Sequence, residues 1–238
     1  MTGCCAHRGG TEKTPENTLP AFEAALELNV DMIEFDLRVT ADGHVVVMHD
    51  ATVDRTTDGT GEIANLTLEQ LKRLDAGSWH SLRFAGTPVP TLDEVLQIMP
   101  PSVLLNMELK GGERLVERVL EQVTARDMMD QCLLAARADQ AALARSLQPQ
   151  VQIIDMQRQG DAADLYIAHT QQTGAQFLQF PRPQVTEEAV ACCHELGITV
   201  NVFKSDEPED QRLLIGWGVD FILTDRPDVL LKTLGRPG

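Results

Sequence analysis

Short apolar runs alternate with amphipathic segments along most of the chain. The runs have the length and aliphatic content of buried strands, whereas the segments between them repeat apolar residues at the spacing of a helix. Eight runs are expected as strands, at residues 4–7, 32–37, 103–109, 132–136, 151–155, 175–180, 199–203 and 220–224. The pattern therefore predicts eight strands separated by helices.

Helix start signals support the helical segments. Thr67 and Thr91 each have Gln or Glu three residues later, which is the spacing of a capping box. Thr18 stands before Leu19 and Pro20, an order typical of a helix N-terminus. We therefore expect helices to begin just after these three threonines.

Eight strands alternating with helices within 238 residues predict an α/β fold, a (β/α)8 barrel of the TIM type. A doubly wound open sheet is the competing arrangement. The strand count holds only if residues 44–50 stay outside the barrel. Residues 40–43 form a hairpin-type turn, so residues 44–50 should return antiparallel to the second strand and bring His49 to the barrel mouth.

The segment at about 50–90 does not fit a single strand and helix unit. It begins rich in turn residues, continues into a short helical pattern and ends in a loop. We interpret it as a small insertion after the second strand, lying over the C-terminal face, where barrel active sites occur. Residues 1–238 are otherwise expected to form one catalytic domain.

The charge balance limits the kinds of molecule that the protein is expected to bind. With 36 acidic and 20 basic residues the formal net charge is -16, which argues against binding to nucleic acid or stable association with an anionic membrane. No segment approaches 18 uninterrupted apolar residues, and no signal-peptide pattern precedes the first strand. We expect a cytoplasmic protein, a monomer or homodimer, acting on a small molecule.

The five cysteines do not form a metal-binding or disulfide pattern. Their number is odd, and two pairs are adjacent in sequence, at 4–5 and 192–193. We interpret them as small buried apolar residues in a reducing compartment, with the second pair inside a helix core.

Three acidic residues should converge at the barrel mouth. Glu34 and Asp36 share one face of the second strand, because side chains two residues apart on a strand point the same way, and Glu108 has the same setting on the next strand. Such carboxylates must share protons, pair with cations or bind a metal. Oxygen ligands favour one hard divalent ion, Mg²⁺ or Ca²⁺. The alternative is a set of salt bridges to Lys110 and Arg8.

Two histidines are placed to exchange protons at the same mouth. His7 ends the first strand and His49 ends the antiparallel return segment. Imidazole is the side chain best suited to proton transfer near neutral pH, so the pair suggests one acid and one base. A structural role at a strand end is the alternative for either histidine alone. We interpret the other four histidines as surface or packing residues.

Arg8 and Lys110 supply positive charge in an otherwise acidic protein. A guanidinium offers paired donors to a phosphate and an ammonium adds a point charge, so the two residues are candidate phosphate ligands. Partnership with the three acids is their alternative role. Asn106 shares the strand face of Glu108 and is expected to provide only a supporting hydrogen bond.

Taken together, these residues resemble the motifs of the glycerophosphodiester phosphodiesterase family, in its cytoplasmic bacterial form. The resemblance covers essentially the whole chain and rests on segments 6–10, 15–18, 34–36, 42–43, 49–50, 55–59, 90–92, 108–110 and 224–227.

The resemblance implies a TIM barrel that hydrolyses glycerophosphodiesters to sn-glycerol 3-phosphate and an alcohol. It also implies that Glu34, Asp36 and Glu108 bind the metal, with Mn²⁺ as a further candidate ion. In the same pattern His7 and His49 are the acid and base, and Arg8 and Lys110 contact the phosphate. We favour His49 as the acid and His7 as the base. The nucleophile is either water or the glycerol 2-hydroxyl.

The chain departs from the family at one place. Many members carry Trp-Thr on the seventh barrel strand, where this sequence has Phe203 and Lys204. Phe203 is expected to form a wall of the substrate pocket without the indole donor. Lys204 either contacts the phosphate or is solvated.

Two other functions compete with this interpretation. A lysophospholipase D would use the same acids and histidines but needs an apolar stripe near the mouth for an acyl chain. A barrel that is not catalytic should have lost one of the ligands or histidines, and the sequence retains them all.

Overall fold

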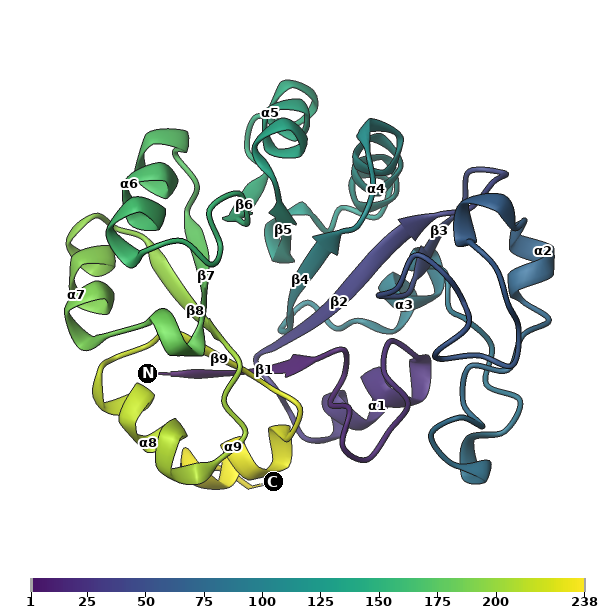
Figure 1. The fold of residues 1–238 in the computed structure, drawn as a ribbon, viewed down its shortest axis with the longest axis horizontal. Helices are drawn as coiled ribbons and strands as arrows, with labels where there is room; N and C mark the ends of the chain where they lie inside the picture. Colours follow the sequence, from purple (N-terminus) through teal and green to yellow (C-terminus); the bar gives the residue numbers. More distant parts are fainter. Residues whose placement is uncertain (1, 238) are drawn as a thin grey trace.

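The strands alternate with helices in the computed structural model, which describes residues 2–237 (Figure 1). The barrel strands are β1 (Gly3–His7), β2 (Met32–Val39), β4 (Leu104–Leu109), β5 (Cys132–Ala136), β6 (Gln152–Asp155), β7 (Phe177–Pro181), β8 (Thr199–Phe203) and β9 (Phe221–Thr224). The helices around them are α1 (Leu19–Glu27), α3 (Leu92–Ile98), α4 (Glu113–Ala125), α5 (Ala138–Leu147), α6 (Ala163–Thr173), α7 (Glu187–Glu195), α8 (Pro208–Gly216) and α9 (Pro227–Thr233). Short 3₁₀ turns, η3 (Met129–Gln131) and η4 (Arg182–Gln184), complete the connections.

The eight strands close into a parallel barrel. Each pairs with its neighbours in chain order, and β1 pairs with both β2 and β9. The prediction of a TIM-type barrel is confirmed. The alternative of an open sheet is wrong, because the first and last strands of an open sheet would not pair with each other.

The alternation along β2 divides the barrel interior from the outer core. Ile33 and Phe35 pack in the layer between strands and helices, whereas Met32 packs inside the barrel. Glu34 and Asp36 therefore point inward, as predicted from their spacing. The inner apolar cluster also contains Cys5, Leu133, Ala135, Ile154 and Leu223.

The predicted hairpin after β2 is present. β3 (Val45–Val47) runs antiparallel to β2, with Leu37 opposite Val47, and Gly43 allows the turn with a φ of 88°. This strand is shorter than the predicted 44–50, so His49 lies in the loop beyond its end.

The segment 50–90 carries only short elements, η1 (Ile63–Asn65), α2 (Leu68–Leu71) and η2 (Leu82–Phe84), to one side of the barrel (Figure 1). It has an apolar cluster of its own with β3, formed by Val46, Met48, Val53, Ile63, Leu71, Ala76 and Val89. Arg55 of this segment reaches Glu16 in the loop after β1. The segment is therefore fastened to the end of the barrel at which β1 finishes.

The helix signals are largely confirmed. Both predicted capping boxes, at Thr67 and Thr91, are present. Thr18 is the N-cap residue of α1, but its side chain makes no capping hydrogen bond and donates instead to the carbonyl of Pro15. The helix begins where it was expected.

The cysteines are all free, and one prediction about them is wrong. Cys192 is exposed, whereas its neighbour Cys193 is buried on the inner side of α7. Adjacent residues on a helix point about 100° apart, so the two cannot both face the core. Burial raises the pKa of the Cys132 and Cys193 thiols to about 12, which makes these two side chains inert apolar groups.

Across residues 2–237, no helix has both the length and the apolar composition needed to cross a membrane.

Candidate active site

The three predicted acids meet inside the barrel mouth. Glu34 and Asp36 lie on β2, and Asp36 is in register with Glu108 on β4. One carboxylate oxygen from each lies within 4.8 Å of the other two. Glu34 and Asp36 are buried, at 2% and 0% exposure, whereas Glu108 is partly exposed.

The acidic cluster is electrostatically costly without a cation. Burial raises the pKa of the Glu34 carboxyl well above its usual range, and repulsion from Asp36 and Glu108 adds to the increase. Oδ1 of Asp36 is buried and has no hydrogen-bond donor among the described residues. A buried carboxylate oxygen without a donor, within a set of three oxygen ligands, fits a hard divalent ion.

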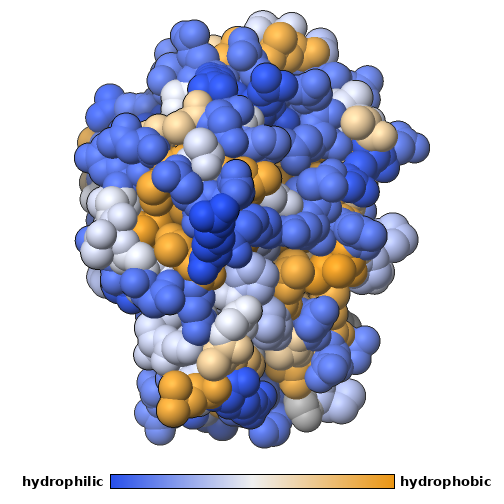
Figure 2. All heavy atoms as spheres, turned by 90° about the vertical axis from the view of Figure 1, so that its right-hand side faces the viewer, coloured by the Kyte–Doolittle hydropathy of each residue, from blue (hydrophilic) through white to orange (hydrophobic). Residues whose placement is uncertain are grey.

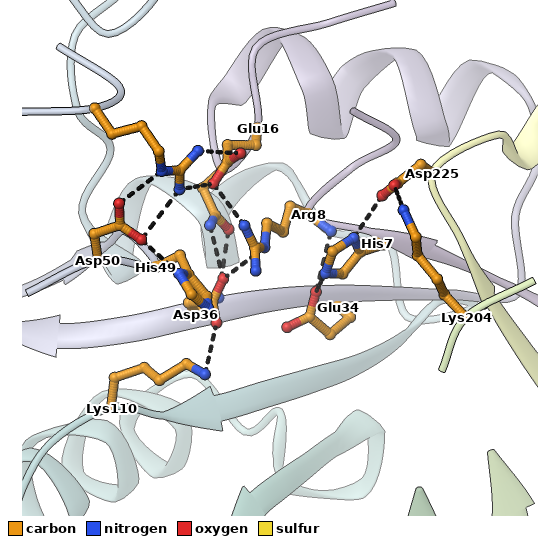
Figure 3. A network of polar contacts seen from close by, with 12 residues as sticks. His7, Arg8, Glu16, Glu34, Asp36, His49, Asp50, Lys110, Lys204 and Asp225 are labelled. Carbon is orange, nitrogen blue, oxygen red and sulfur yellow. Dashed lines mark hydrogen bonds and ion pairs between the residues drawn. The ribbon is translucent and has the colours of Figure 1, made fainter. Parts of the chain in front are cut away.

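Arg8 and Lys110 both contact the acids. Nζ of Lys110 pairs with Glu108 and lies 3.5 Å from Oδ1 of Asp36. Nε of Arg8 lies 3.2 Å from Oδ2 of Asp36, and its backbone N–H donates to Oε2 of Glu34 at 3.1 Å. The salt bridges considered as an alternative role are therefore present, and they place both cations at the edge of the acidic cluster (Figure 3).

The Arg8 guanidinium is held from its other side. It donates to Oε1 of Glu16 at 2.8 Å, and Arg55 donates to both oxygens of the same carboxylate. Although burial opposes it, these hydrogen bonds lower the pKa of the Glu16 carboxyl. Glu16 thus remains ionised and fixes the guanidinium beside Asp36.

The loop after β1 depends on a left-handed backbone. Arg8 and Gly9 have φ angles of 50° and 89°. A Cβ on Gly9 would lie 2.8 Å from the backbone carbonyl carbon of Ala21, so only glycine fits against α1 here. This path turns the backbone N–H of Arg8 toward Glu34.

His7 is held by the last barrel strand. Its Nδ1 atom lies 2.5 Å from Oδ1 of Asp225, which follows β9, and its Nε2 atom lies 3.9 Å from Oε2 of Glu34. Burial would raise the pKa of the Asp225 carboxyl, but hydrogen bonds from His7 and Lys204 lower it well below the usual range. An ionised carboxylate only accepts, so Nδ1 donates and Nε2 remains available at the acidic cluster.

Lys204, for which a phosphate contact and a solvated position were both considered, lies beside Asp225. Its ammonium pairs with Asp225 and with Asp206, the latter at 3.1 Å. Its side chain is exposed, and in this position it supports the carboxylate that orients His7.

His49 has a matching arrangement from the other side of the mouth. Its Nδ1 atom lies 2.6 Å from Oδ1 of Asp50, which Arg55 also binds. The hydrogen bond from Arg55, followed by that from His49, lowers the pKa of the Asp50 carboxyl well below its usual range. The adjacent Met48 N–H donates to the Asp36 carbonyl at 3.0 Å, which holds the backbone next to His49 against β2.

Phe203, at the end of β8, packs edge-on against the ring of His7, with the ring centroids 5.1 Å apart. Its side chain is partly buried. The position puts an apolar surface beside one of the two histidines.

Two asparagines near the acids have different roles. Nδ2 of Asn17 donates to Oδ2 of Asp36 at 2.9 Å, so it stabilises one of the cluster carboxylates directly. Asn106 instead donates to Gln179 at 3.1 Å, within a buried group of amides that also includes Asn201. The supporting hydrogen bond expected of Asn106 exists, but it is not made to the acids.

Sequence reasoning gave no role to several residues that support the site. The set comprises Glu16, Asn17, Asp50, Arg55 and Asp225. Each lies within a segment on which the family resemblance rests, and that was the only available signal. The remaining histidines lie elsewhere, for example His169 against Asp155 and His194 against Asp220.

A comparison with models of protein families matches residues 7–229 to the glycerophosphoryl diester phosphodiesterase family. The matched range contains both histidines, all three acids and both cations of the site.

Individual relatives extend over the same length. A glycerophosphodiester phosphodiesterase of Caldanaerobacter subterraneus subsp. tengcongensis is 33% identical over 98% of both chains. The solved structure of a glycerophosphodiester phosphodiesterase from Agrobacterium tumefaciens has a TM-score of 0.87 at 28% identity, covering 98% of this chain and all of its own. An Oleispira antarctica phosphodiesterase, solved with the product sn-glycerol-3-phosphate, shares the fold with a TM-score of 0.91 at 24% identity, over 99% of this chain and 97% of its own.

Proposed function

Because the chain belongs to the glycerophosphoryl diester phosphodiesterase family, we propose that it hydrolyses glycerophosphodiesters to sn-glycerol 3-phosphate and an alcohol. The observation that carries this proposal is the position of His7 and His49 beside one cluster of three carboxylates, each histidine held by an ionised aspartate. The Oleispira antarctica relative, solved with sn-glycerol-3-phosphate, supports the same product for this fold.

Glu34, Asp36 and Glu108 would hold one divalent ion, Mg²⁺ or Ca²⁺, with Mn²⁺ also compatible with oxygen ligands. Such an ion neutralises phosphoryl oxygens and lowers the pKa of a bound hydroxyl. Asn17 holds the second oxygen of Asp36, while the first accepts no hydrogen bond and has only the Lys110 ammonium at 3.5 Å.

Arg8 and Lys110 are proposed to bind the phosphodiester. Both cations already lie at the edge of the acidic cluster, where an anionic phosphate would otherwise be repelled. The negative charge on the phosphoryl oxygens grows in the transition state, so fixed cations at this edge lower its free energy. Glu16 keeps the Arg8 guanidinium in place during this step.

The two histidines divide the proton transfers. Nε2 of His7 accepts the proton of the nucleophile, and Nε2 of His49 donates a proton to the leaving alkoxide. Asp225 and Asp50 hold each Nδ1–H and stabilise each ring when it is charged. The nucleophile is water or the substrate 2-hydroxyl, and only the second produces a cyclic phosphate. Phe203 is proposed to shield the His7 side of the pocket.

The whole chain would form one catalytic domain, with the segment 50–90 inserted after the second barrel strand and fastened to the loops at the barrel mouth. Arg55 of that segment binds both Asp50, beside His49, and Glu16, beside Arg8. A segment that folded as a separate domain would not be expected to donate these hydrogen bonds to residues beside the active site.

Release of the alcohol from a lysophospholipid is the second candidate. A cavity of about 670 Å³ favours it, because apolar side chains such as Leu28, Phe84 and Pro227 line it between α1, η2 and α9. Its lining includes none of the three acids. On the side of the molecule that carries segment 50–90, polar residues interrupt the apolar patches (Figure 2). These features favour the water-soluble diester.

The test uses protein treated with a chelator and then supplied separately with Mg²⁺, Ca²⁺ or Mn²⁺. Formation of sn-glycerol 3-phosphate is measured with glycerophosphocholine and with other headgroups, alongside lysophosphatidylcholine in liposomes. We expect turnover of the soluble diesters that requires a restored metal. Choline release from the liposomes alone would establish the second candidate, and no hydrolysis with any metal would indicate a barrel that is not catalytic.

A further inference from the structure

A polar cavity of about 380 Å³ opens beside the acidic cluster, between the C-terminal ends of β4, β5 and β6. Glu108 and Lys110 form one of its walls, so the cavity is continuous with the site described above. Arg38, Arg137 and Asp139 supply the other charged groups of its lining. The apolar contribution is small and includes Met156.

The cavity lies across the barrel from the wall formed by His7 and Phe203. That wall belongs to β1 and β8, which are separated from β5 and β6 in both directions around the barrel. A phosphodiester centred on the acids therefore has two ends that point to different surfaces. The aromatic ring of Phe203 is one of these surfaces, and the charged cavity is the other.

The charged cavity adjoins the backbone of the proposed acid, His49, through Arg38. Arg38 lines it and donates from Nε and Nη2 to the backbone carbonyl of His49, at 2.9 and 2.5 Å. The leaving oxygen must lie near the histidine that protonates it. An alcohol headgroup in this cavity would leave the glycerol on the side of Phe203.

Arg137 is the cation of this cavity that has no internal partner. It follows β5 directly, its side chain is exposed, and its guanidinium makes no ion pair or hydrogen bond with any residue that the structure describes. The other cations are engaged, Lys110 with Glu108 and Arg38 with backbone carbonyls. Arg137 is therefore available to a ligand without first breaking a contact.

The acidic residues that line the cavity together with Arg137 are Glu108 and Asp139. Glu108 is paired with Lys110 and belongs to the proposed metal ligands. Asp139, in the first turn of α5, makes no ion pair within residues 2–237. The cavity thus presents one unpaired guanidinium and one unpaired carboxylate.

We propose that this cavity binds the alcohol headgroup and that Arg137 selects headgroups carrying a carboxylate. This inference rests on the proposed function. A guanidinium binds a carboxylate through two parallel hydrogen bonds, which a trimethylammonium group does not accept. An amino-acid headgroup such as serine would also place its ammonium near Asp139. Glycerophosphoserine is accordingly the preferred substrate over glycerophosphocholine.

The experiment compares kcat/KM for glycerophosphoserine, glycerophosphoglycerol and glycerophosphocholine at saturating metal. The wild type, Arg137→Gln and Arg137→Glu are measured beside the control Arg158→Gln, which removes an exposed arginine that pairs with Asp161 outside the cavity. Arg137→Gln should lower kcat/KM for glycerophosphoserine by about tenfold, as expected for a charge-assisted hydrogen bond. The value for glycerophosphocholine should change less than about twofold, and Arg137→Glu should reverse the preference.

Each result decides between the two proposals. Equal effects of Arg137→Gln on all three headgroups, or no effect on glycerophosphoserine, would overturn the selection by Arg137 while hydrolysis of the diesters persists. Absence of hydrolysis of all three by the wild type would overturn the proposed function itself. The control should match the wild type with every substrate.

Discussion

Nδ1 of His7 lies 2.5 Å from Oδ1 of Asp225, although the two residues are 218 positions apart in the chain. Barrel closure brings them together, because the pairing of β1 with β9 places the loops after both strands side by side. On the other side of the mouth, Asp50 holds His49 from the next position in sequence. The two histidines are therefore oriented alike by one distant and one adjacent carboxylate.

Asp225→Asn should lower kcat for glycerophosphocholine by about 100-fold or more, because the amide can leave the wrong nitrogen of His7 protonated. Metal binding should be unchanged, since Asp225 is not part of the acidic cluster. Asp228→Asn is the matched control, as Asp228 pairs with Lys13 instead. An Asp225 variant as active as this control would contradict the positioning role.

His49→Ala should lose most turnover while retaining metal binding. The change removes the proposed proton donor and leaves all three cluster carboxylates in place. Steady-state kinetics and calorimetric metal titration measure the two properties. His44→Ala, at the exposed turn before β3, should behave as the wild type. Hydrolysis of glycerophosphocholine at the wild-type rate by His49→Ala would refute the assignment.

Glu108→Ala should weaken metal binding by about tenfold or more, because one of three carboxylate ligands is lost. Isothermal titration with Mg²⁺, Ca²⁺ and Mn²⁺ checks this. Glu113→Ala, in the exposed first turn of α4, provides the control for the loss of a nearby negative charge. Unaltered affinity in Glu108→Ala would exclude Glu108 as a ligand.

Metal-induced stabilisation should increase with pH. The pKa of the Glu34 carboxyl is raised by burial and by its acidic neighbours, so its protonated form stabilises the fold, and this contribution is lost as pH rises through the folded-state pKa. Metal binding requires the ionised form and competes with the proton. The Tm difference with and without Mg²⁺ should therefore grow between about pH 5 and 8.

Glu34→Gln provides the comparison for this pH dependence. The amide keeps the shape of the side chain but does not titrate, so its Tm difference should be smaller and nearly independent of pH. A wild-type Tm difference that is constant across this range would contradict the role given to Glu34.

Gly9→Ala should destabilise the protein by about 2 kcal/mol or more, from a left-handed backbone and a clash with Ala21. Gly61→Ala is the matched control, because its φ of 117° is also unfavourable for alanine but nothing lies within 4 Å of the added Cβ. Urea unfolding should give the larger loss for Gly9→Ala. Equal losses would show that the contact with α1 is unimportant.

Local patterns in the sequence were sufficient for the fold. Strand length, helix spacing and the turn before Gly43 depend on neighbouring residues, so they could be recognised without tertiary contacts. The inward direction of Glu34 and Asp36 followed from the same two-residue period that buries Phe35 outside the barrel. The error at Cys192 arose because local pattern gives the helix but only packing decides which of two adjacent residues faces inward.

The sequence by itself determined the barrel and the residue types that reach its mouth, because the periodicity of strands and helices is a local property of the chain. The tertiary structure alone decided which side chains hold these residues in place. Asp225 contacts His7 because closure of the barrel makes the last strand a neighbour of the first. Lys204 pairs with this same Asp225 and not with the three carboxylates of the acidic cluster. Contacts between such distant positions depend on how the strands close in space, and no local pattern encodes them.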